Sequence, residues 1–194
     1  YDQKITMANI SLGVFDDSDY KEDAPTVGIR VANGNNILNY TLDMSDEPLW
    51  TDLATSNLPL LGKKYYVLST NSTSTRALTL LDSAVDAMLT EGETTTLTIG
   101  SKTYEVSVNF IGSTPEVKLE INGEVTNSLL ETETQKLSDG AYIGIKDIMY
   151  TSKDTGVSKV EFSIGSGKLK LTNNTDVELN DNSISGLKVL FSET

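Results

Sequence analysis

Hydrophobic and polar residues alternate along most of this chain, and this alternation is its strongest structural signal. A period of two places successive side chains on opposite faces of a β-strand. In the first part of the chain the clearest apolar positions are Ile10/Leu12/Val14, Val27/Ile29/Val31 and Leu38/Tyr40/Leu42. Later stretches have theirs at Tyr104/Val106/Val108/Phe110, Val117/Leu119/Ile121, Val160/Phe162/Ile164, Leu169/Leu171, Val177/Leu179 and Leu187/Val189. Each stretch predicts a strand.

Turn sequences separate these stretches. Asn33-Gly34 lies between the second and third of them, and an Asn-Gly pair between alternating runs favours a tight hairpin. We therefore predict that residues 27–31 pair with residues 38–42. The segment Gly112–Pro115 and the pair Asn122-Gly123 predict further turns. Short strands separated by regularly spaced turns are typical of β-sandwiches and barrels.

Residues 77–90 fit two different patterns. Helical spacing is followed by Leu78, Leu81, Val85 and Met88. Asp82-Ser83 also has the side chains that cap a helix. The alternative is a buried strand over residues 77–81, with residues 87–90 leading into another strand. We favour strands, because an isolated amphipathic helix fits poorly in a β-rich chain.

The character of the sequence changes near Glu91. The earlier part contains the single Trp, three of the four prolines and a Ser/Thr-rich run over residues 69–75, whereas the later alternation is regular. We predict an all-β chain of two immunoglobulin-like β-sandwich modules, an N-terminal β-rich module over 1–90 and a C-terminal β-sandwich module over 91–194. The segments EGETTTLTIG from Glu91 and ETETQKLSDG from Glu131 share residues at matching offsets, which predicts two similar strand-turn units within one sheet.

Composition narrows the possible chemistry. The chain has no His, no Cys and a net charge of -13. It therefore lacks the imidazole base, the thiolate nucleophile and the ligands of most zinc, copper and iron sites. The negative charge disfavours nucleic acid and anionic membranes as partners. No apolar run approaches the roughly 20 residues that span a bilayer, and residues 1–10 lack the features of a signal peptide, so we expect a mature product or a fragment with no membrane insertion.

Four Asn-x-Ser/Thr sequons are candidate sites of N-glycosylation, at Asn9, Asn39, Asn71 and Asn173. Asn9 and Asn39 occupy the polar phase of their alternating stretches. Asn71 lies in the Ser/Thr-rich run, and Asn173 lies between two predicted strands. We therefore expect all four side chains to face solvent, as a glycan requires.

Acidic residues suggest a possible calcium site. Five carboxylates lie close together at Asp16, Asp17, Asp19, Glu22 and Asp23. A calcium ion would relieve their mutual repulsion, although their spacing does not follow the EF-hand loop, and the alternative is a solvated acidic loop. The segment Asn180-Asp181-Asn182 is a weaker candidate that a turn explains.

Three other groups of residues are candidates for activity. Glu91/Glu93 and Glu131/Glu133 would each share one strand face, where paired carboxylates act in glycosidases but are more commonly exposed surface charges. Gly165–Lys168 lacks the first Gly and the final Ser/Thr of a phosphate-binding loop, and favours a hairpin turn. An aromatic platform for sugars would be built from Trp50, Tyr65 and Tyr66, although scattered aromatics more often belong to a core.

Two blocks of sequence carry a resemblance to a known family. Leu60–Phe110 contains LGKKYYV, LTLL, EGE and GSKTYEVSV, and Val117–Leu171 contains NGE, LSDG, YIGIKDI and VEFSIG. These motifs resemble those of archaeal surface-layer (S-layer) glycoproteins, over roughly residues 36–171. The resemblance implies an extracellular, β-rich and often glycosylated subunit of a two-dimensional lattice. The NGE turn falls on residues 122–124.

We therefore expect a structural protein of the cell surface that self-associates, carries glycans and catalyses no reaction. Its possible cofactor is calcium. The main alternative is a surface-displayed adhesin or carbohydrate-binding module, which would present an exposed aromatic platform on a concave face. A hydrolase that uses only carboxylates is the third possibility, and it would need converging carboxylates in a pocket.

Overall fold

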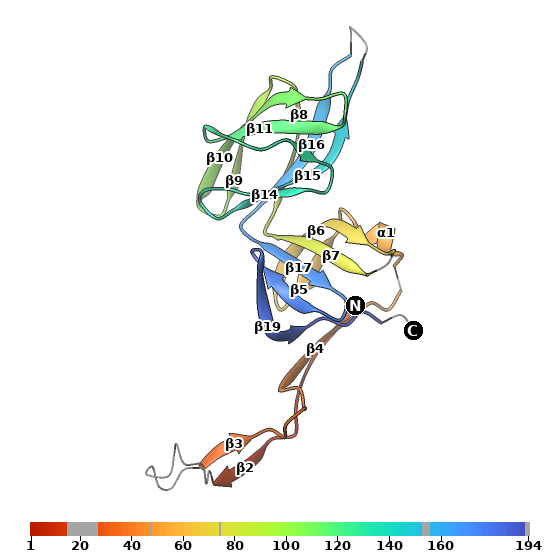
Figure 1. Ribbon diagram of the computed structural model, residues 1–194, viewed down its shortest axis with the longest axis vertical. Helices are drawn as coiled ribbons and strands as arrows, with labels where there is room; N and C mark the ends of the chain where they lie inside the picture. Colours follow the sequence, from red (N-terminus) through yellow and green to blue (C-terminus); the bar gives the residue numbers. More distant parts are fainter. Residues whose placement is uncertain (15–26, 47, 74, 153–155, 193–194) are drawn as a thin grey trace. The chain divides into compact units, whose positions relative to one another are not determined.

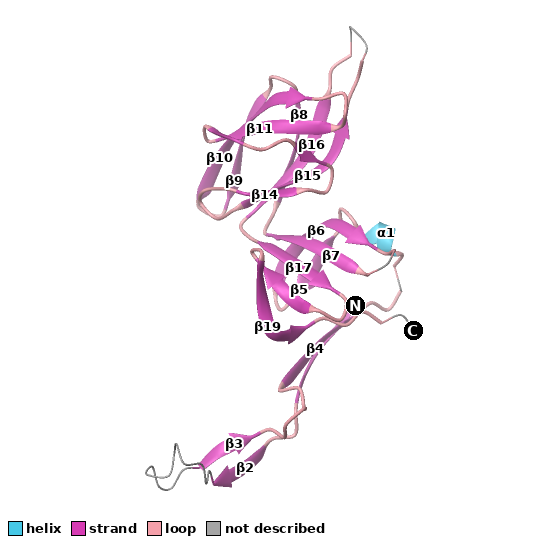
Figure 2. Cartoon of the chain, viewed as in Figure 1, coloured by secondary structure: helices cyan, strands magenta, loops and turns pink. Residues whose placement is uncertain are grey.

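The computed structural model describes residues 1–14, 27–46, 48–73, 75–152 and 156–192. The chain divides into two compact units, Tyr1–Glu47 (unit 1) and Pro48–Thr194 (unit 2). Within the described ranges nearly all regular structure is strand, and helix α1 (Trp50–Leu53) is a single turn (Figure 2). The predicted all-β class is therefore confirmed.

Unit 1 is a two-stranded antiparallel ribbon. Its first ladder pairs β1 (Asp2–Met7) with β4 (Leu38–Asp43), and its second pairs β2 (Ser11–Val14) with β3 (Val27–Arg30). Between the ladders, the N–H of Ala8 donates to the carbonyl of Ile37 at 3.1 Å. Figure 1 shows the two ladders following one another along unit 1.

The predicted hairpin between residues 27–31 and 38–42 is wrong. Both stretches form strands, but β3 pairs with β2 and β4 pairs with β1. A turn does form at Asn33-Gly34, where the N–H of Asn35 donates to the carbonyl of Ala32 and Gly34 has a φ of 84°. It interrupts one side of the ribbon without reversing it, and the strands on its two sides pair with β2 and β1 instead of with each other.

Within unit 2, most residues between 85 and 165 form a β-sandwich of two sheets. One sheet has the strand order β14-β15-β16-β8 and the other β12-β11-β10-β9, with β13 also paired to β11. Their bounds are β8 (Val85–Thr90), β9 (Thr94–Ile99), β10 (Lys102–Ile111), β11 (Glu116–Ile121), β12 (Glu124–Val125), β13 (Leu129–Leu130), β14 (Thr134–Lys136), β15 (Tyr142–Met149) and β16 (Lys159–Gly165).

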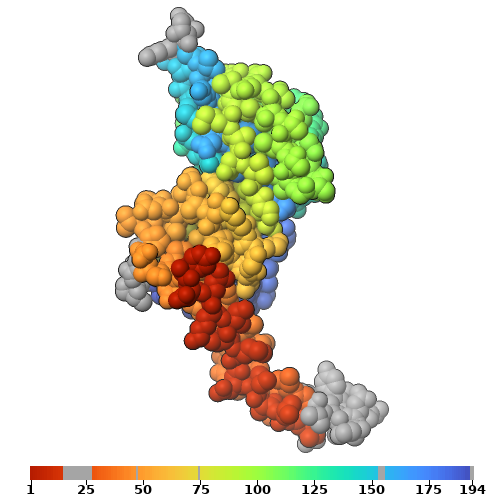
Figure 3. Space-filling model, turned by 180° about the vertical axis from the view of Figure 1, so that it is seen from behind, coloured from red at the N-terminus to blue at the C-terminus, as the bar shows by residue number. Residues whose placement is uncertain are grey.

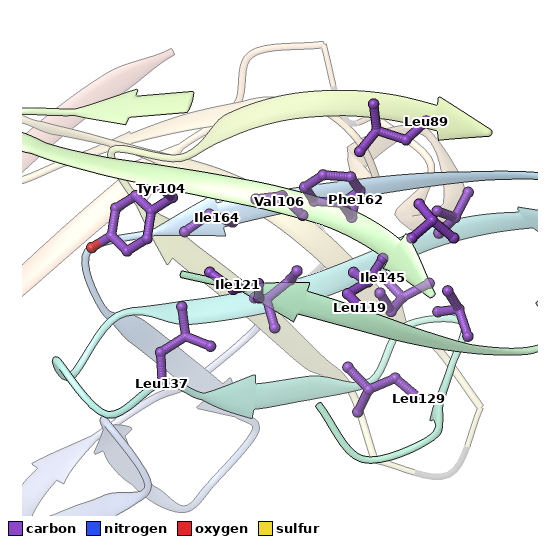
Figure 4. Packing of buried hydrophobic residues seen from close by; sticks show 14 of the residues in the cluster. Leu89, Tyr104, Val106, Leu119, Ile121, Leu129, Leu137, Ile145, Phe162 and Ile164 are labelled. Atoms are coloured by element: carbon purple, nitrogen blue, oxygen red, sulfur yellow. The ribbon is translucent and has the colours of Figure 1, made fainter. Parts of the chain in front are cut away.

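The apolar faces of these two sheets enclose one core (Figure 4). Alternate residues of β10 and β11 point inward, as do those of β15 and β16, among them Val106, Leu119, Ile145 and Phe162. The turn predicted at Gly112–Pro115 is confirmed, since the strands before and after it, β10 and β11, pair antiparallel.

The remaining strands of unit 2 form a six-stranded sheet with the order β19-β18-β17-β7-β6-β5. Their bounds are β5 (Asn57–Leu60), β6 (Lys63–Asn71), β7 (Ala77–Asp82), β17 (Lys168–Thr172), β18 (Asp176–Leu179) and β19 (Asn182–Lys188). The whole sandwich lies between β7 and β17 in sequence, yet these two strands are neighbours. The sandwich is therefore an insertion into this sheet.

Residues 77–90 form the strands β7 and β8, so the preference for strands over a helix is confirmed. The predicted modules, 1–90 and 91–194, remain an expectation. Strand pairing joins the two sides of that boundary, since β8 pairs with β16 and β7 with β17. The boundary between the compact units lies after Glu47.

Candidate functional site

The ribbon of unit 1 presents two strips of apolar side chains. In the first ladder Ile5 is opposite Tyr40 and Met7 is opposite Leu38, so these four side chains share a face, here called the first strip. In the second ladder Leu12 is opposite Ile29, and they share a face with Val14, here called the second strip. Figure 3 shows the ribbon as a narrow column of red and orange atoms.

These strips are strongly exposed. Met7 is 66% exposed, Leu12 79% and Ile29 62%. In the second ladder the opposite face is formed by Ser11, Arg30 and a directly paired Gly13 and Gly28. Two glycines contribute no side-chain packing, so neither face of this ladder gains stability from burial.

A buried lysine lies where the sandwich meets the six-stranded sheet. The side chain of Lys146 is 9% exposed, and its ammonium pairs with Glu161 and lies 4.0 Å from a carboxylate oxygen of Asp86. The other oxygen of Asp86 accepts a hydrogen bond from the Ser163 hydroxyl. The ammonium is also 5.0 Å from the ring centre of Tyr66, which belongs to β6. We call these residues the Lys146 cluster.

The Lys146 cluster keeps its lysine charged. Burial alone would lower the pKa of Lys146, but its hydrogen bond with Glu161, together with its interactions with Tyr66 and Asp86, raises the pKa above its ordinary value. A protonated, hydrogen-bonded ammonium is a poor nucleophile and a poor base. Its ion pairs join the strands β15, β16 and β8 of one sheet, and its contact with Tyr66 reaches β6 of the six-stranded sheet.

A second cluster ties the two parts of unit 2 together. Lys168 of β17 pairs with Asp181, and the Tyr142 hydroxyl of β15 donates to that carboxylate at 2.8 Å. Lys168 also donates to the Thr134 hydroxyl at 3.1 Å. We call these four residues the Lys168 cluster. Although burial acts in the opposite direction, the hydrogen bonds from Lys168 and Tyr142 lower the pKa of Asp181, and burial together with Asp181 raises the pKa of Tyr142 to about 12.

Two glycines let the six-stranded sheet approach the sandwich closely. A Cβ atom at Gly144 would lie 2.5 Å from the Leu68 side chain, and one at Gly165 would lie 2.8 Å from Cβ of Leu81. Leu68 and Leu81 form a small buried cluster with Tyr66 and Tyr142. The junction is therefore close-packed as well as charge-paired.

A third lysine–carboxylate–tyrosine group lies within the sandwich. Asp139 accepts hydrogen bonds from Lys102 at 2.8 Å, from the Tyr104 hydroxyl at 2.7 Å and from the Ala141 N–H at 3.0 Å. Burial alone would raise the pKa of Asp139, but these donors lower it to about 2. The pKa of Tyr104 is raised to about 12 by burial and by Asp139.

The sequons lie on strands and turns of both units. Asn9, Asn39 and Asn71 are exposed, and Asn39 is on the polar phase of β4 as predicted. The Asn71 side-chain oxygen accepts hydrogen bonds from the N–H and the hydroxyl of Thr73, both at 3.0 Å. Asn173 is half-buried rather than exposed, because its side-chain oxygen accepts the N–H of Phe191 at 2.9 Å.

The paired glutamates lie in turns and not on strand faces, which corrects the sequence interpretation. Glu93 accepts the N–H of Thr90, and Glu133 accepts the N–H of Leu130. The hydrogen bonds from the backbone and the hydroxyl of Thr90 hold the pKa of Glu93 below its ordinary value. Glu131 accepts the N–H of Ile148. These carboxylates stabilise local backbone.

The repeated sequence does mark two similar turns. In the first turn the N–H of Gly92 donates to the carbonyl of Val108, and the N–H of Val108 donates to the carbonyl of Glu93. In the second turn Thr132 donates to Ile145, and Ile145 donates to Glu133, through the same backbone groups. The expectation that both units lie in one sheet is wrong. One turn leads from β8 to β9 and the other from β13 to β14, so each crosses between the two sheets of the sandwich.

The other sequence candidates have structural roles. Gly165–Lys168 links β16 to β17, which are not paired, so the expected hairpin turn is wrong. Tyr66 is buried, and Trp50 is half-buried with its ring edge against Phe191, 5.0 Å between centres, so they form no exposed platform with Tyr65.

Of the two candidate cation sites in the sequence, the structure describes only Asn180-Asp181-Asn182. Asn180 and Asp181, with φ of 51° and 65°, form the predicted turn between β18 and β19. The acidic segment Asp16–Asp23 lies outside the described residues. Within the described ranges, no group of three or more acidic side chains is placed to hold a metal ion.

An open depression of about 460 Å³ lies on β17 and β18, next to the Lys168 cluster. Its lining includes Lys170, Asp176, Glu178 and Asp181. Lys170 pairs with Glu178 at 3.4 Å, and Asp181 is already bound by Lys168. Asp176 is the remaining carboxylate of the lining named here, and its Oδ1 is buried without a hydrogen-bond partner among the described residues.

Comparison with protein-family models, curated proteins and solved structures finds no match to this chain. Among the described helical residues, none belongs to a helix long and apolar enough to cross a membrane. The sequence interpretation missed the buried lysines. The available signal was a lysine within a mostly apolar strand, as at Lys146 in YIGIKDIM.

Proposed function

We propose that this chain is a structural protein of the cell surface, a subunit or fragment of an archaeal surface layer that acts through self-association and not through catalysis. The observation that carries the proposal is the exposed apolar strips of unit 1. Exposed apolar surface organised along a strand pair is a feature of association sites, since soluble chains otherwise keep such patches small. Within this proposal the sandwich of residues 85–165 is an immunoglobulin-like module.

The organisation of unit 2 supports a mechanical role. The sandwich is connected to the six-stranded sheet by two chain crossings, by the Lys146 and Lys168 clusters, and by close packing at Gly144 and Gly165. Buried charges that are paired and hydrogen-bonded favour one defined arrangement of the layers. A subunit of a lattice has to transmit force between its layers without rearrangement.

The exposed sequons support a location outside the cell. Asn9, Asn39 and Asn71 leave room for a glycan. The alternative function, a surface-displayed adhesin or carbohydrate-binding module, has less support. Its expected aromatic platform would require Trp50 and Tyr66 to be exposed, and both are engaged in packing.

Proteolysis of intact cells tests this proposal. We expect peptides of this chain to be released from the cell surface under conditions in which a cytoplasmic marker protein stays intact. Mass analysis of the same peptides should find added mass on at least one of Asn9, Asn39 and Asn71. Recovery of the protein solely from the cytoplasmic fraction would overturn the surface assignment.

A further inference from the structure

The sequence contains two Asn-Gly pairs, Asn33-Gly34 and Asn122-Gly123. In such a pair the backbone nitrogen of the glycine can attack the side-chain carbonyl carbon of the asparagine, because glycine has no Cβ atom that hinders the approach. Ammonia leaves, and a five-membered succinimide ring forms. Water then opens the ring at either carbonyl, so the asparagine becomes aspartate or isoaspartate. The reaction consumes one water and releases one ammonia, without an oxidant or a cofactor.

The two glycines have the same surroundings. Each lies in a turn with a positive φ, 84° at Gly34 and 83° at Gly123. A Cβ atom added to either glycine would meet no heavy atom within 4 Å. The asparagines Asn33 and Asn122 are both exposed. Exposure and glycine conformation therefore do not distinguish the two pairs.

The side chain of Asn122 is held by hydrogen bonds. Its Oδ1 accepts the N–H of Glu105 at 2.8 Å, and its Nδ2 donates to the carbonyl of Thr103 at 3.3 Å. The N–H of Asn122 also donates to the carbonyl of Glu105 at 2.9 Å. Both partners belong to β10, which contributes to the sandwich core. The Asn122 amide must leave these partners before the Gly123 nitrogen can attack it.

The side chain of Asn33 has no comparable restraint. Its turn is closed by the backbone bond from the N–H of Asn35 to the carbonyl of Ala32, at 3.1 Å. Among the described residues, none forms a hydrogen bond with the Asn33 side chain. The turn lies in the ribbon, whose apolar side chains are mostly exposed, and segments with little buried surface open readily. The Asn33 amide can therefore turn toward the Gly34 nitrogen.

We propose that Asn33 is a site of spontaneous deamidation in the folded chain, and that Asn122 is protected from the same reaction by its hydrogen bonds to β10. The product adds one negative charge to the ribbon, and isoaspartate also adds one carbon atom to the main chain of the turn. The inference does not depend on the proposed function, since the reaction needs only water and a base such as hydroxide.

Incubation of the full 194-residue chain at mildly alkaline pH tests this site, with peptide mapping by mass spectrometry at successive times. Methylation by protein isoaspartate methyltransferase identifies isoaspartate in the same peptides. A parallel incubation in concentrated guanidinium chloride unfolds both pairs. Ala32 precedes one pair and Ile121 the other, so the unfolded chain measures the part of the difference that neighbouring residues cause.

We expect Asn33 to react at least about tenfold faster than Asn122 in the folded chain, because reaction at Asn122 requires local opening. In guanidinium chloride the two rates should become similar. Asn33→Gln is the control variant, since glutamine would have to close a six-membered ring, which forms far more slowly. This variant should give no isoaspartate at position 33 and leave the rate at Asn122 unchanged.

Three results would overturn the inference. The first is a rate at Asn122 that equals or exceeds the rate at Asn33 in the folded chain. The second is a ratio of rates that is as large in guanidinium chloride as in the folded chain, which would assign the difference to neighbouring residues. The third is an Asn33 that stays intact in the folded chain, which would show that the ribbon restrains its turn.

Discussion

The ladder β2–β3 and the ladder β10–β11 have the same alternating pattern and opposite environments. In β10 the inward residues Tyr104 and Val106 are buried, because the second sheet of the sandwich covers them. In β2 the corresponding residues Leu12 and Val14 are exposed. The pattern of the sequence therefore specifies a strand with an apolar face, and the presence of a second layer decides whether that face is a core or a surface.

The polar faces of the two ladders differ as well. In β10–β11, Ser107 is opposite Glu120, and the Asn109 amide donates to the Glu120 carboxylate at 3.2 Å. In β2–β3 the corresponding face contains the Gly13/Gly28 pair. Glycine weakens a strand through the entropy of the unfolded chain. We conclude that β10–β11 gains stability from burial within unit 2 that β2–β3 does not gain within unit 1.

The largest expected difference between the two regions is in the cost of removing an apolar side chain. Phe162→Ala should lower the free energy of unfolding of unit 2 by about 3–5 kcal/mol, because Phe162 is fully buried in the sandwich core. Ile29→Ala should change it by less than about 0.5 kcal/mol in dilute solution. Chemical denaturation followed by circular dichroism measures both, and equal losses would contradict the distinction between core and strip.

The next test replaces a glycine by alanine in each of the two regions. Gly144→Ala should destabilise unit 2 by about 1–3 kcal/mol, since the added Cβ overlaps the buried Leu68 side chain. At Gly13 an added Cβ meets no heavy atom within 4 Å. Gly13→Ala is therefore the matched control, and thermal unfolding should show no loss of stability. A tolerated Gly144→Ala would show that the junction is looser than its packing indicates.

Local features of the fold were predictable from sequence, whereas long-range pairings were not. The Asn33-Gly34 turn and the strands on both sides of it form, yet the predicted hairpin fails because β1 and β2 supply the partners from far along the chain. Alternation contains no information about which strands pair. For the same reason no pattern indicated that β7 and β17 are neighbours across the inserted sandwich.

The partners of the buried lysines in unit 2 were also beyond sequence reasoning. Lys146 lies where the register between β15 and β16 shifts, so its burial depends on an irregularity that period-two reasoning does not anticipate. The sequence pattern at Lys168 indicates only a loop, while its partner Asp181 lies in a turn, as the sequence predicts. Their meeting with Tyr142 depends on the insertion of the sandwich, which is a tertiary property.

The cost of removing a carboxylate should also differ between a buried ion pair and an exposed one. Glu161→Gln leaves the Lys146 ammonium buried with only the more distant Asp86, and should cost about 1–2 kcal/mol, given that Glu161 is partly solvated. Adding Lys146→Met should restore part of this loss. The matched control is the more open pair Lys170/Glu178, for which Glu178→Gln should cost less than about 0.5 kcal/mol. Additive losses in a double-mutant cycle at Lys146 and Glu161 would show that their contact contributes no coupling.

The smallest expected effect is a pH dependence of unit 2 that arises from Asp139. Its pKa is about 2 in the folded chain and about 4 when unfolded, so its stabilising contribution is present above pH 4 and is lost as the pH falls through 2. Because this side chain is 35% exposed, solvent screening reduces the contribution to about 1 kcal/mol. Asp139→Asn should lower stability at pH 7 and make the unfolding free energy less dependent on pH between 4 and 2. An unaltered acid dependence in Asp139→Asn would assign the acid sensitivity to other carboxylates, Asp181 among them, whose pKa is also lowered.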